Sequence, residues 1–176
     1  MIECLYLTAA IMGESMNDSE RMNALALDIL KLSRNTLLVN LRFLDRALSM
    51  FDYVSCPDGI IPRTGVPLGG GLATDGKRIY YAPKWVLLRY RKEKEAIVRD
   101  YLHMVFHCVF HHAFVDTLLD IPRWDLACDI AAESAIEDLH LSCATAIRRN
   151  EQDAFVRKLQ NEVKLFSAEK IYAWLM

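Results

Sequence analysis

Four of the chain's five histidines are His103, His107, His111 and His112. At about 100° per residue, a helix would place the first three on one face and His112 roughly opposite His103. Histidines at positions i and i+4 can direct two ring nitrogens to one metal ion. The spacing therefore indicates a divalent metal site, most typically for zinc. The alternative is that these rings are structural and either pack in the core or face solvent.

Further ligands are available near these histidines. Asp129 and Glu133 are four residues apart, which places both carboxylates on one face of a predicted helix. They could complete a metal site or form a solvated acidic stripe. Cys108 and Cys128 border the proposed ligands, and a thiolate is a good zinc ligand. Each lies about 100° from its neighbour on the helix, which favours burial as a small apolar residue.

Three predicted elements must position these side chains. A long helix over about 94–115 carries the histidines, and a helix over about 122–140 carries the carboxylates. Before them, residues 72–82 predict a β-hairpin, because Asp75-Gly76 favours a tight turn and strand-forming residues follow it. Pro83 then opens a short helix to about residue 91.

The rest of the chain is predicted to be helical, apart from one loop. Asn17 and Glu20 indicate a capping box for a helix over about 18–33, and an apolar stripe over 37–51 predicts another amphipathic helix. Met1–Leu7 is also predicted as a helix. A cluster of prolines and glycines over about 57–71 predicts a long loop. Near the C-terminus, Asn150 and Ser167 mark the starts of two further helices.

These elements predict a mainly helical α+β fold in a single domain over residues 1–176. Its predicted parts are an N-terminal helical scaffold, a hairpin with the metal-site helices, and a set of C-terminal helices. They cover 1–56, 68–140 and 150–176, respectively.

Composition excludes several classes of function. The formal net charge is −2, from 21 basic and 23 acidic residues, which argues against binding to nucleic acid. No uncharged stretch approaches the roughly 18 residues of a membrane span. The five cysteines form no C-x-x-C pair, and the start has an early acid where a signal peptide would be basic. We therefore expect a cytoplasmic protein.

Three segments together resemble a known family. They are residues 71–83 (GLATDGKRIYYAP), the pattern His103-x-x-x-His107-x-x-x-x-His112, and residues 124–129 (WDLACD). In this order they resemble a zincin-like metallopeptidase domain of bacterial proteins, which commonly precedes a von Willebrand factor A-like domain. The similarity extends from about residue 68 to 140.

The resemblance implies roles for particular residues. His103 and His107 would bind zinc from one helix, and Asp129 would supply the third ligand. The helical spacing makes His111 the competitor for that third position. The strand over 78–82 would be the edge strand of the sheet, next to the central helix that carries the histidines. An extended peptide would bind along this edge. Its substrate-binding residues would be Arg78, Ile79, Tyr80 and Tyr81.

The chain departs from the family pattern at the catalytic base. The second position of H-E-x-x-H holds a glutamate that acts as general base, and here it is Met104, whose thioether cannot accept the proton. Loss of a general base typically costs about 10²- to 10⁴-fold in rate. Glu133 is a candidate substitute. We therefore expect weak or absent peptidase activity, and the alternative is a non-catalytic module that binds a peptide or protein.

The C-terminal segment predicts a further contact. Ile171, Tyr172, Trp174 and Leu175 place apolar area on several faces of the last predicted helix. This area must be covered by the domain's own core or by another surface. The alternatives to the core are self-association and a von Willebrand factor A-like domain.

Overall fold

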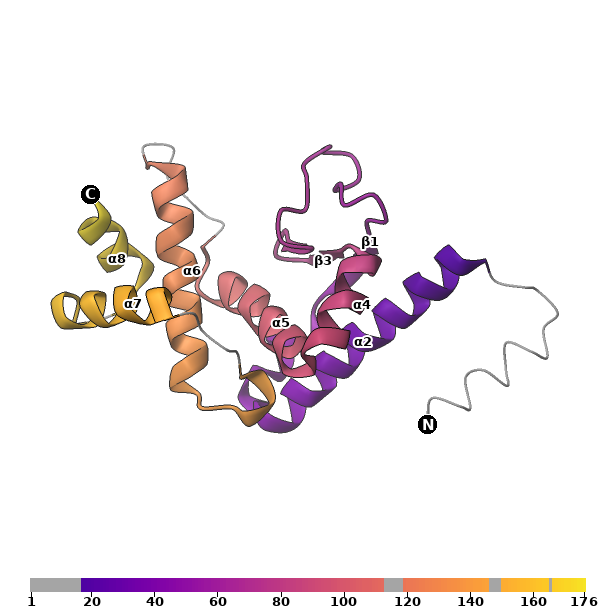
Figure 1. The fold of residues 1–176 in the computed structure, drawn as a ribbon, viewed down its shortest axis with the longest axis horizontal. Coiled ribbons are helices and arrows are strands. Elements are labelled where there is room, and N and C mark those ends of the chain that lie inside the picture. The colour runs from indigo at the N-terminus through magenta and orange to yellow at the C-terminus, as the bar shows by residue number, and fades with distance from the viewer. Residues whose placement is uncertain (1–16, 113–118, 146–149, 165) are drawn as a thin grey trace.

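The computed structural model describes residues 17–112, 119–145, 150–164 and 166–176. Within these ranges the chain is a mainly helical α+β protein with one small sheet, which confirms the predicted fold class (Figure 1). The helix predicted at Met1–Leu7 lies outside the described residues. None of the described helices is both long and apolar enough to span a membrane.

Helix α2 (Asp18–Asn40) begins at the predicted capping box. The Asn17 side chain accepts a hydrogen bond from the Glu20 backbone N–H, and the Glu20 side chain accepts one from the Asn17 N–H, each at 2.9 Å. The helix is longer than predicted. The apolar stripe after it is therefore split between the end of α2, a 3₁₀ turn η1 (Arg42–Leu44) and the short helix α3 (Asp45–Ser49).

Three strands form the sheet: β1 (Asp52–Ser55), β2 (Leu72–Thr74) and β3 (Arg78–Tyr81). Strands β2 and β3 pair antiparallel, which confirms the hairpin, and β1 pairs parallel with β3. The order is β1-β3-β2, so the expectation that 78–82 is an edge strand is wrong. Strand β1 was also missed, because residues 1–56 were predicted to be helical.

The predicted loop joins β1 to β2, and its last residue packs closely against a tryptophan ring. A single bridge pairs Ile60 with Pro67, and the loop finishes at Gly71. Gly71 has a φ of +80°, and its Cα faces the indole ring of Trp85 so closely that a Cβ would overlap it. Only glycine fits this position, because both the backbone conformation and the contact exclude a side chain.

The next elements carry the candidate site. Helix α4 (Pro83–Lys92) has Pro83 in its first turn, as predicted, and is followed by α5 (Lys94–Val109). Helix α5 ends well before residue 115, and His111 has a φ of 58°, so His111 is not on the helix. Helix α6 (Ile121–Asp138) then crosses α5 and leads to a 3₁₀ turn, η2 (Ser142–Ala144).

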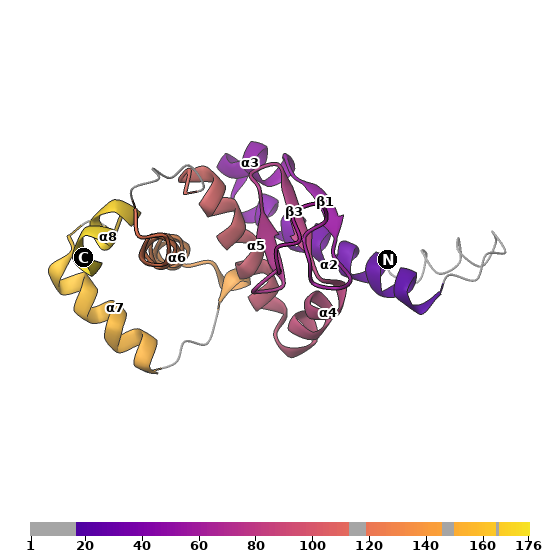
Figure 2. The same ribbon diagram turned by 90° about the horizontal axis from the view of Figure 1, so that it is seen from above.

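The last two helices pack on α6. They are α7 (Asn150–Glu162) and α8 (Ala168–Leu175), and Ser167 caps α8 by accepting a hydrogen bond from the Lys170 N–H. Figure 2 shows α7 and α8 beside α6, on the side away from the sheet. Ile171 is fully buried in this packing. The chain's own core thus covers much of the apolar face that suggested self-association, and any partner at this helix stays a prediction.

Two hydrophobic cores are present among the described residues. The larger combines the sheet with α2, α4, α5 and one face of α6, and the smaller lies between α6, α7 and α8. Helix α6 contributes Ala132 and Ile136 to the larger core and Trp124 and Ala127 to the smaller. The contact between α5 and α6 therefore lies where the two cores meet.

Candidate metal centre

Three side chains from α5 and α6 converge at this junction. The Nε2 atoms of His103 and His107 are 2.8 Å apart, and Asp129 Oδ1 lies 3.3 Å from the first and 3.2 Å from the second. The two rings are mostly buried, whereas the Asp129 side chain is 58% exposed. This is the group among the described residues whose donor atoms could hold one metal ion.

The donor triangle fits a small divalent cation. Ligands about 2.0–2.1 Å from a tetrahedral ion lie roughly 3.3 Å from one another, close to the separations from Asp129. Two neutral imidazole nitrogens at 2.8 Å repel each other unless a proton or a cation lies between their lone pairs. Two imidazoles and a carboxylate are also ligands that zinc accepts. The residues present thus fit the metal that the sequence predicted.

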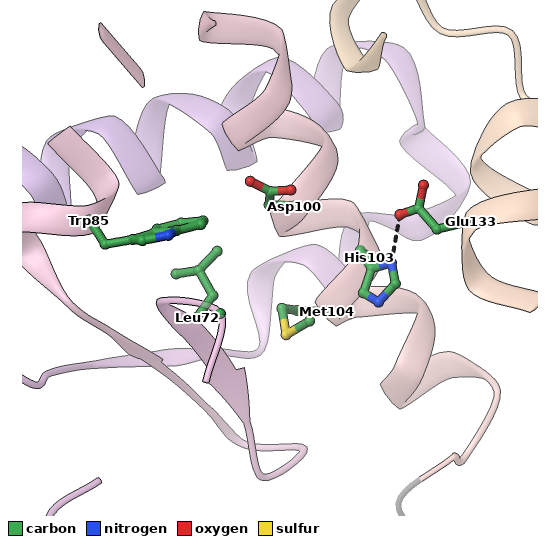
Figure 3. A pocket seen from close by; sticks show the side chains of 7 residues that line it. Leu72, Trp85, Asp100, His103, Met104 and Glu133 are labelled. Atoms are coloured by element: carbon green, nitrogen blue, oxygen red, sulfur yellow. Dashed lines mark hydrogen bonds and ion pairs between the residues drawn. The ribbon is translucent and has the colours of Figure 1, made fainter. Parts of the chain in front are cut away.

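The other ring nitrogen of His103 faces Glu133. Its Nδ1 lies 2.7 Å from Glu133 Oε1, and a dashed line in Figure 3 marks this interaction. A carboxylate there accepts the Nδ1–H, so Nε2 is the ring nitrogen directed at the triangle. Glu133 therefore orients a ligand, and its contact lies on the opposite ring nitrogen from the metal position. This geometry does not suit Glu133 to the role of general base.

Glu133 is itself held by a buried arginine. Arg99 donates to Glu133 Oε2 from Nε at 2.8 Å and from Nη2 at 2.5 Å. Arg99 also donates to Glu137 Oε1 at 3.3 Å and to the Ala144 carbonyl at 3.1 Å. The two oxygens of the Glu133 carboxylate are thus divided, one for the arginine and one for the histidine.

The charged groups of this cluster shift one another's pKa values toward their ionised forms. Burial lowers the pKa of His103, but hydrogen bonds with Asp129 and Glu133 outweigh it and raise that pKa to about 9. Burial raises the pKa of Asp129, whereas hydrogen bonds with the two histidines bring it well below its usual value. The pKa of Glu133 is lowered too, because His103 and Arg99 outweigh the effect of burial. Both carboxylates are therefore ionised at neutral pH.

His107 also has a partner on its other nitrogen. Its Nδ1 lies 3.3 Å from Nδ1 of His112, which is buried and whose carbonyl accepts a hydrogen bond from the Trp124 indole N–H. Burial and the neighbouring His107 lower the pKa of His112 to about 4. His112 is therefore neutral and can accept the Nδ1–H of His107, which directs the His107 Nε2 lone pair at the triangle.

The structure separates the predicted ligands into two groups. His103, His107, Asp129 and Glu133 come together as the spacing indicated. His111 lies outside the triangle, because α5 ends at Val109 and the chain turns away. The helical wheel placed His112 opposite the site for the same reason, since it assumed that the helix continued.

Neither neighbouring cysteine reaches the triangle. Cys108 Sγ lies 3.7 Å from the Thr74 hydroxyl on β2, and burial raises the pKa of this thiol. Cys128 is buried in the smaller core, where burial raises its pKa to about 12. Both are therefore thiols rather than thiolates. Cys128 is buried, as predicted, whereas Cys108 is only partly buried.

A cavity of about 200 Å³ adjoins His103 on the side of the sheet. Figure 3 shows Leu72, Trp85 and Met104 around it, with Asp100 and Glu133 at its margin. Met104 offers only a thioether to this space. Asp100 accepts hydrogen bonds from Arg89 at 2.7 and 3.2 Å, so its carboxylate is already paired.

Arg99 is the residue of this cluster that the sequence interpretation missed. A signal existed in the spacing: Arg99, His103 and His107 recur every fourth residue on α5, and carboxylates recur at 129, 133 and 137 on α6. As the residue number rises along α5, the number of its partner falls along α6. Two complementary stripes of this kind predict a contact between the helices.

Comparison with known proteins identifies one family. A family model described as "Putative metallopeptidase domain" matches residues 62–176, which include every residue of the triangle and its partners. No curated protein and no solved structure matches the chain significantly.

Proposed function

Since the chain belongs to this putative metallopeptidase domain family, we propose that it binds one divalent metal ion through His103, His107 and Asp129. The observation that carries the proposal is the triangle of Nε2, Nε2 and Oδ1 atoms, 2.8–3.3 Å apart. Partners behind both histidines support it, because they direct the two Nε2 lone pairs at one point. Zinc is the proposed ion, since it accepts imidazole and carboxylate ligands together.

We propose that peptide hydrolysis at this site is weak or lost. Bound zinc would polarise a substrate carbonyl oxygen. Hydrolysis also needs a base within hydrogen-bond reach of the attacking water. Met104 cannot accept a proton, and Glu133 is engaged by Arg99 and by the far nitrogen of His103. The chain would therefore have the proposed ligands without a base placed to use them.

A peptide partner would bind at β2 rather than β3. Strand β3 is paired on both sides, and the side chains of Ile79 and Tyr81 are buried. Arg78 and Tyr80 both contact Asp75 in the hairpin turn. In the described sheet β2 is an edge strand, and it packs against α5, which carries the histidines. A free edge can pair with the backbone of an extended peptide.

The alternative function is a peptide- or protein-binding module whose histidines are structural. It is favoured by the hydrogen bonds between the side chains of the site. His103 contacts both Asp129 and Glu133, and these contacts join α5 to α6. In this alternative a proton on His103 takes the place of the metal.

Calorimetric titration with zinc separates the two functions. We expect wild-type protein, purified without a histidine tag, to bind one zinc ion per chain. A His103→Ala, His107→Ala double variant should bind at least about 100-fold more weakly, since two ligands are lost. His111→Ala is the matched control and should bind like wild type. Equal affinity in the wild type and the double variant would favour the structural alternative.

Turnover is tested separately with an unstructured peptide and added zinc. We expect little or no cleavage by the wild type. Met104→Glu places a carboxylate at the base position and should increase zinc-dependent cleavage. Zinc-dependent cleavage by the wild type at a rate unchanged in Met104→Ala would show that another group is the base.

A further inference from the structure

Arg99 is a charged residue in an unusual place. It is only 6% exposed, in the core of the contact between α5 and α6. Four of its donor contacts reach Glu133, Glu137 and the Ala144 carbonyl. It lies one helical turn before His103 and does not touch the donor triangle. Burying a guanidinium is costly unless it is fully paired, so its surroundings are built around it.

We propose that Arg99 is the positioning residue of the metal centre and acts on His103 through Glu133. The inference rests on the proposed metal site. Arg99 holds Oε2 of Glu133, which leaves Oε1 as the acceptor for His103 Nδ1–H at 2.7 Å. The carboxylate therefore cannot rotate away without losing its pair of hydrogen bonds from the guanidinium. His103 keeps one ring orientation and one tautomer in consequence.

The geometry requires arginine rather than any cation. The planar guanidinium binds Glu133 through Nε and Nη2, while its remaining nitrogen reaches the Ala144 carbonyl. A lysine ammonium is a point charge with three donors and cannot reproduce this planar fork. Lysine at position 99 would preserve the charge next to Glu133 and lose the orientation of its carboxylate.

A second arginine in the same region provides a matched control. Arg89 on α4 donates to both oxygens of Asp100 on α5 through Nε and Nη2, at 2.7 and 3.2 Å. This is also an arginine–carboxylate pair, although Arg89 binds both oxygens of Asp100 whereas Arg99 binds Glu133 through Oε2 alone. The hydrogen bonds of Arg89 to Asp100 do not involve a histidine of the triangle. Arg89→Lys should therefore remove the paired hydrogen bonds of an arginine to a carboxylate without changing the orientation of a metal ligand.

The proposal is tested by titration with Co²⁺, whose visible absorption reports its ligand set. We expect Arg99→Lys to bind Co²⁺ about 10- to 100-fold more weakly than the wild type, and Glu133→Gln to show a similar loss. A variant that combines Arg99→Lys with Glu133→Gln should lose no more Co²⁺ affinity than the weaker-binding single variant, because both changes act on His103. Arg89→Lys should bind like the wild type. Wild-type affinity in Arg99→Lys, or two losses that multiply, would overturn the proposal.

A second measurement, on the wild type and on Glu133→Gln, covers the case in which Arg99→Lys does not fold. Nitrogen-15 NMR of the zinc-loaded wild type should place the proton of His103 on Nδ1, and Glu133→Gln should weaken its hydrogen bond. A proton on Nε2 of His103 in the loaded protein would overturn the proposal. Failure of the wild type to bind Co²⁺ or zinc at all would instead refute the metal site itself.

Discussion

The two hydrophobic cores are assembled from different parts of the chain. The larger combines α2, the sheet, α4 and α5, so residues as distant as Leu30 and Leu102 lie in one cluster. The smaller uses α6 together with α7 and α8, which follow it directly in sequence. The matched family region begins at residue 62, yet α2 supplies part of the larger core. The family region thus depends on the helices before it.

The candidate metal centre draws on both cores. Helix α5, rooted in the larger core, supplies His103 and His107, and α6, shared with the smaller, supplies Asp129. Neither core alone contains the full ligand set. The site therefore depends on how α6 is placed between two packing surfaces.

The largest effect is expected from the larger core. Ile97 on α5 is fully buried there. Ile97→Ala should lower the free energy of unfolding by about 2–5 kcal/mol, through lost burial and the cavity that remains. Urea denaturation measures this, with Leu88→Ala as the control because Leu88 is exposed on α4. A cost below about 1 kcal/mol would mean that this core is not the main source of stability.

Zinc should couple the two cores. At a free concentration about 100-fold above its dissociation constant, it should stabilise the folded chain by about 2.7 kcal/mol. Because its ligands come from α5 and α6, the protection should extend to amides on both sides of the junction. Hydrogen exchange with and without zinc measures it. Protection confined to α5 would show that Asp129 is not a ligand.

The smaller core should respond more locally. Ile171 on α8 is fully buried, and Ile171→Ala should cost about 2 kcal/mol, at the lower end for such changes. We expect faster hydrogen exchange in α7 and α8, with little change in the β2–β3 hairpin, since the cavity lies in the smaller core. Equal loss of protection in the hairpin would show that the two cores unfold as one unit.

The pH dependence of metal binding distinguishes the two helices' contributions. His103, with its pKa raised to about 9, must lose a proton before its Nε2 can bind a metal. Asp129 is already ionised, because its pKa is lowered. Zinc affinity should therefore rise with pH up to about 9, by roughly tenfold per unit for one displaced proton. Calorimetry in buffers of different ionisation enthalpy would count that proton, and a flat profile would contradict it.

The sequence predicted the local elements of the fold well. The Asn17 cap, the hairpin and the helix after Pro83 are each set by short-range chemistry, and the structure confirms them. Strand β1 was missed because its four residues directly follow an apolar helical stripe and pair with β3, which is distant in sequence. That pairing also moved β3 from the edge to the centre of the sheet.

The site was predictable where it depended on helical spacing. His103 with His107, and Asp129 with Glu133, share faces because each pair lies within an unbroken helix. The prediction that His111 shares a helical face with His103 and His107 was wrong, because α5 ends earlier than its apolar pattern suggested. The partners on the outer ring nitrogens depend on how two helices cross, and a single helical wheel carries no information about that.

Acidic residues repeat along α6, so charge attraction alone does not determine how α6 is aligned along α5. Carboxylates recur at 125, 129, 133 and 137. A slide of α6 by one turn, about 5.4 Å along its axis, would put Asp129 in the place of Glu133 and Asp125 in the place of Asp129. The attraction to α5 would be nearly unchanged. The same slide would put Ala132 where the buried Ile136 lies and open a void. Shape therefore selects which acid meets which histidine, and charge only draws the helices together.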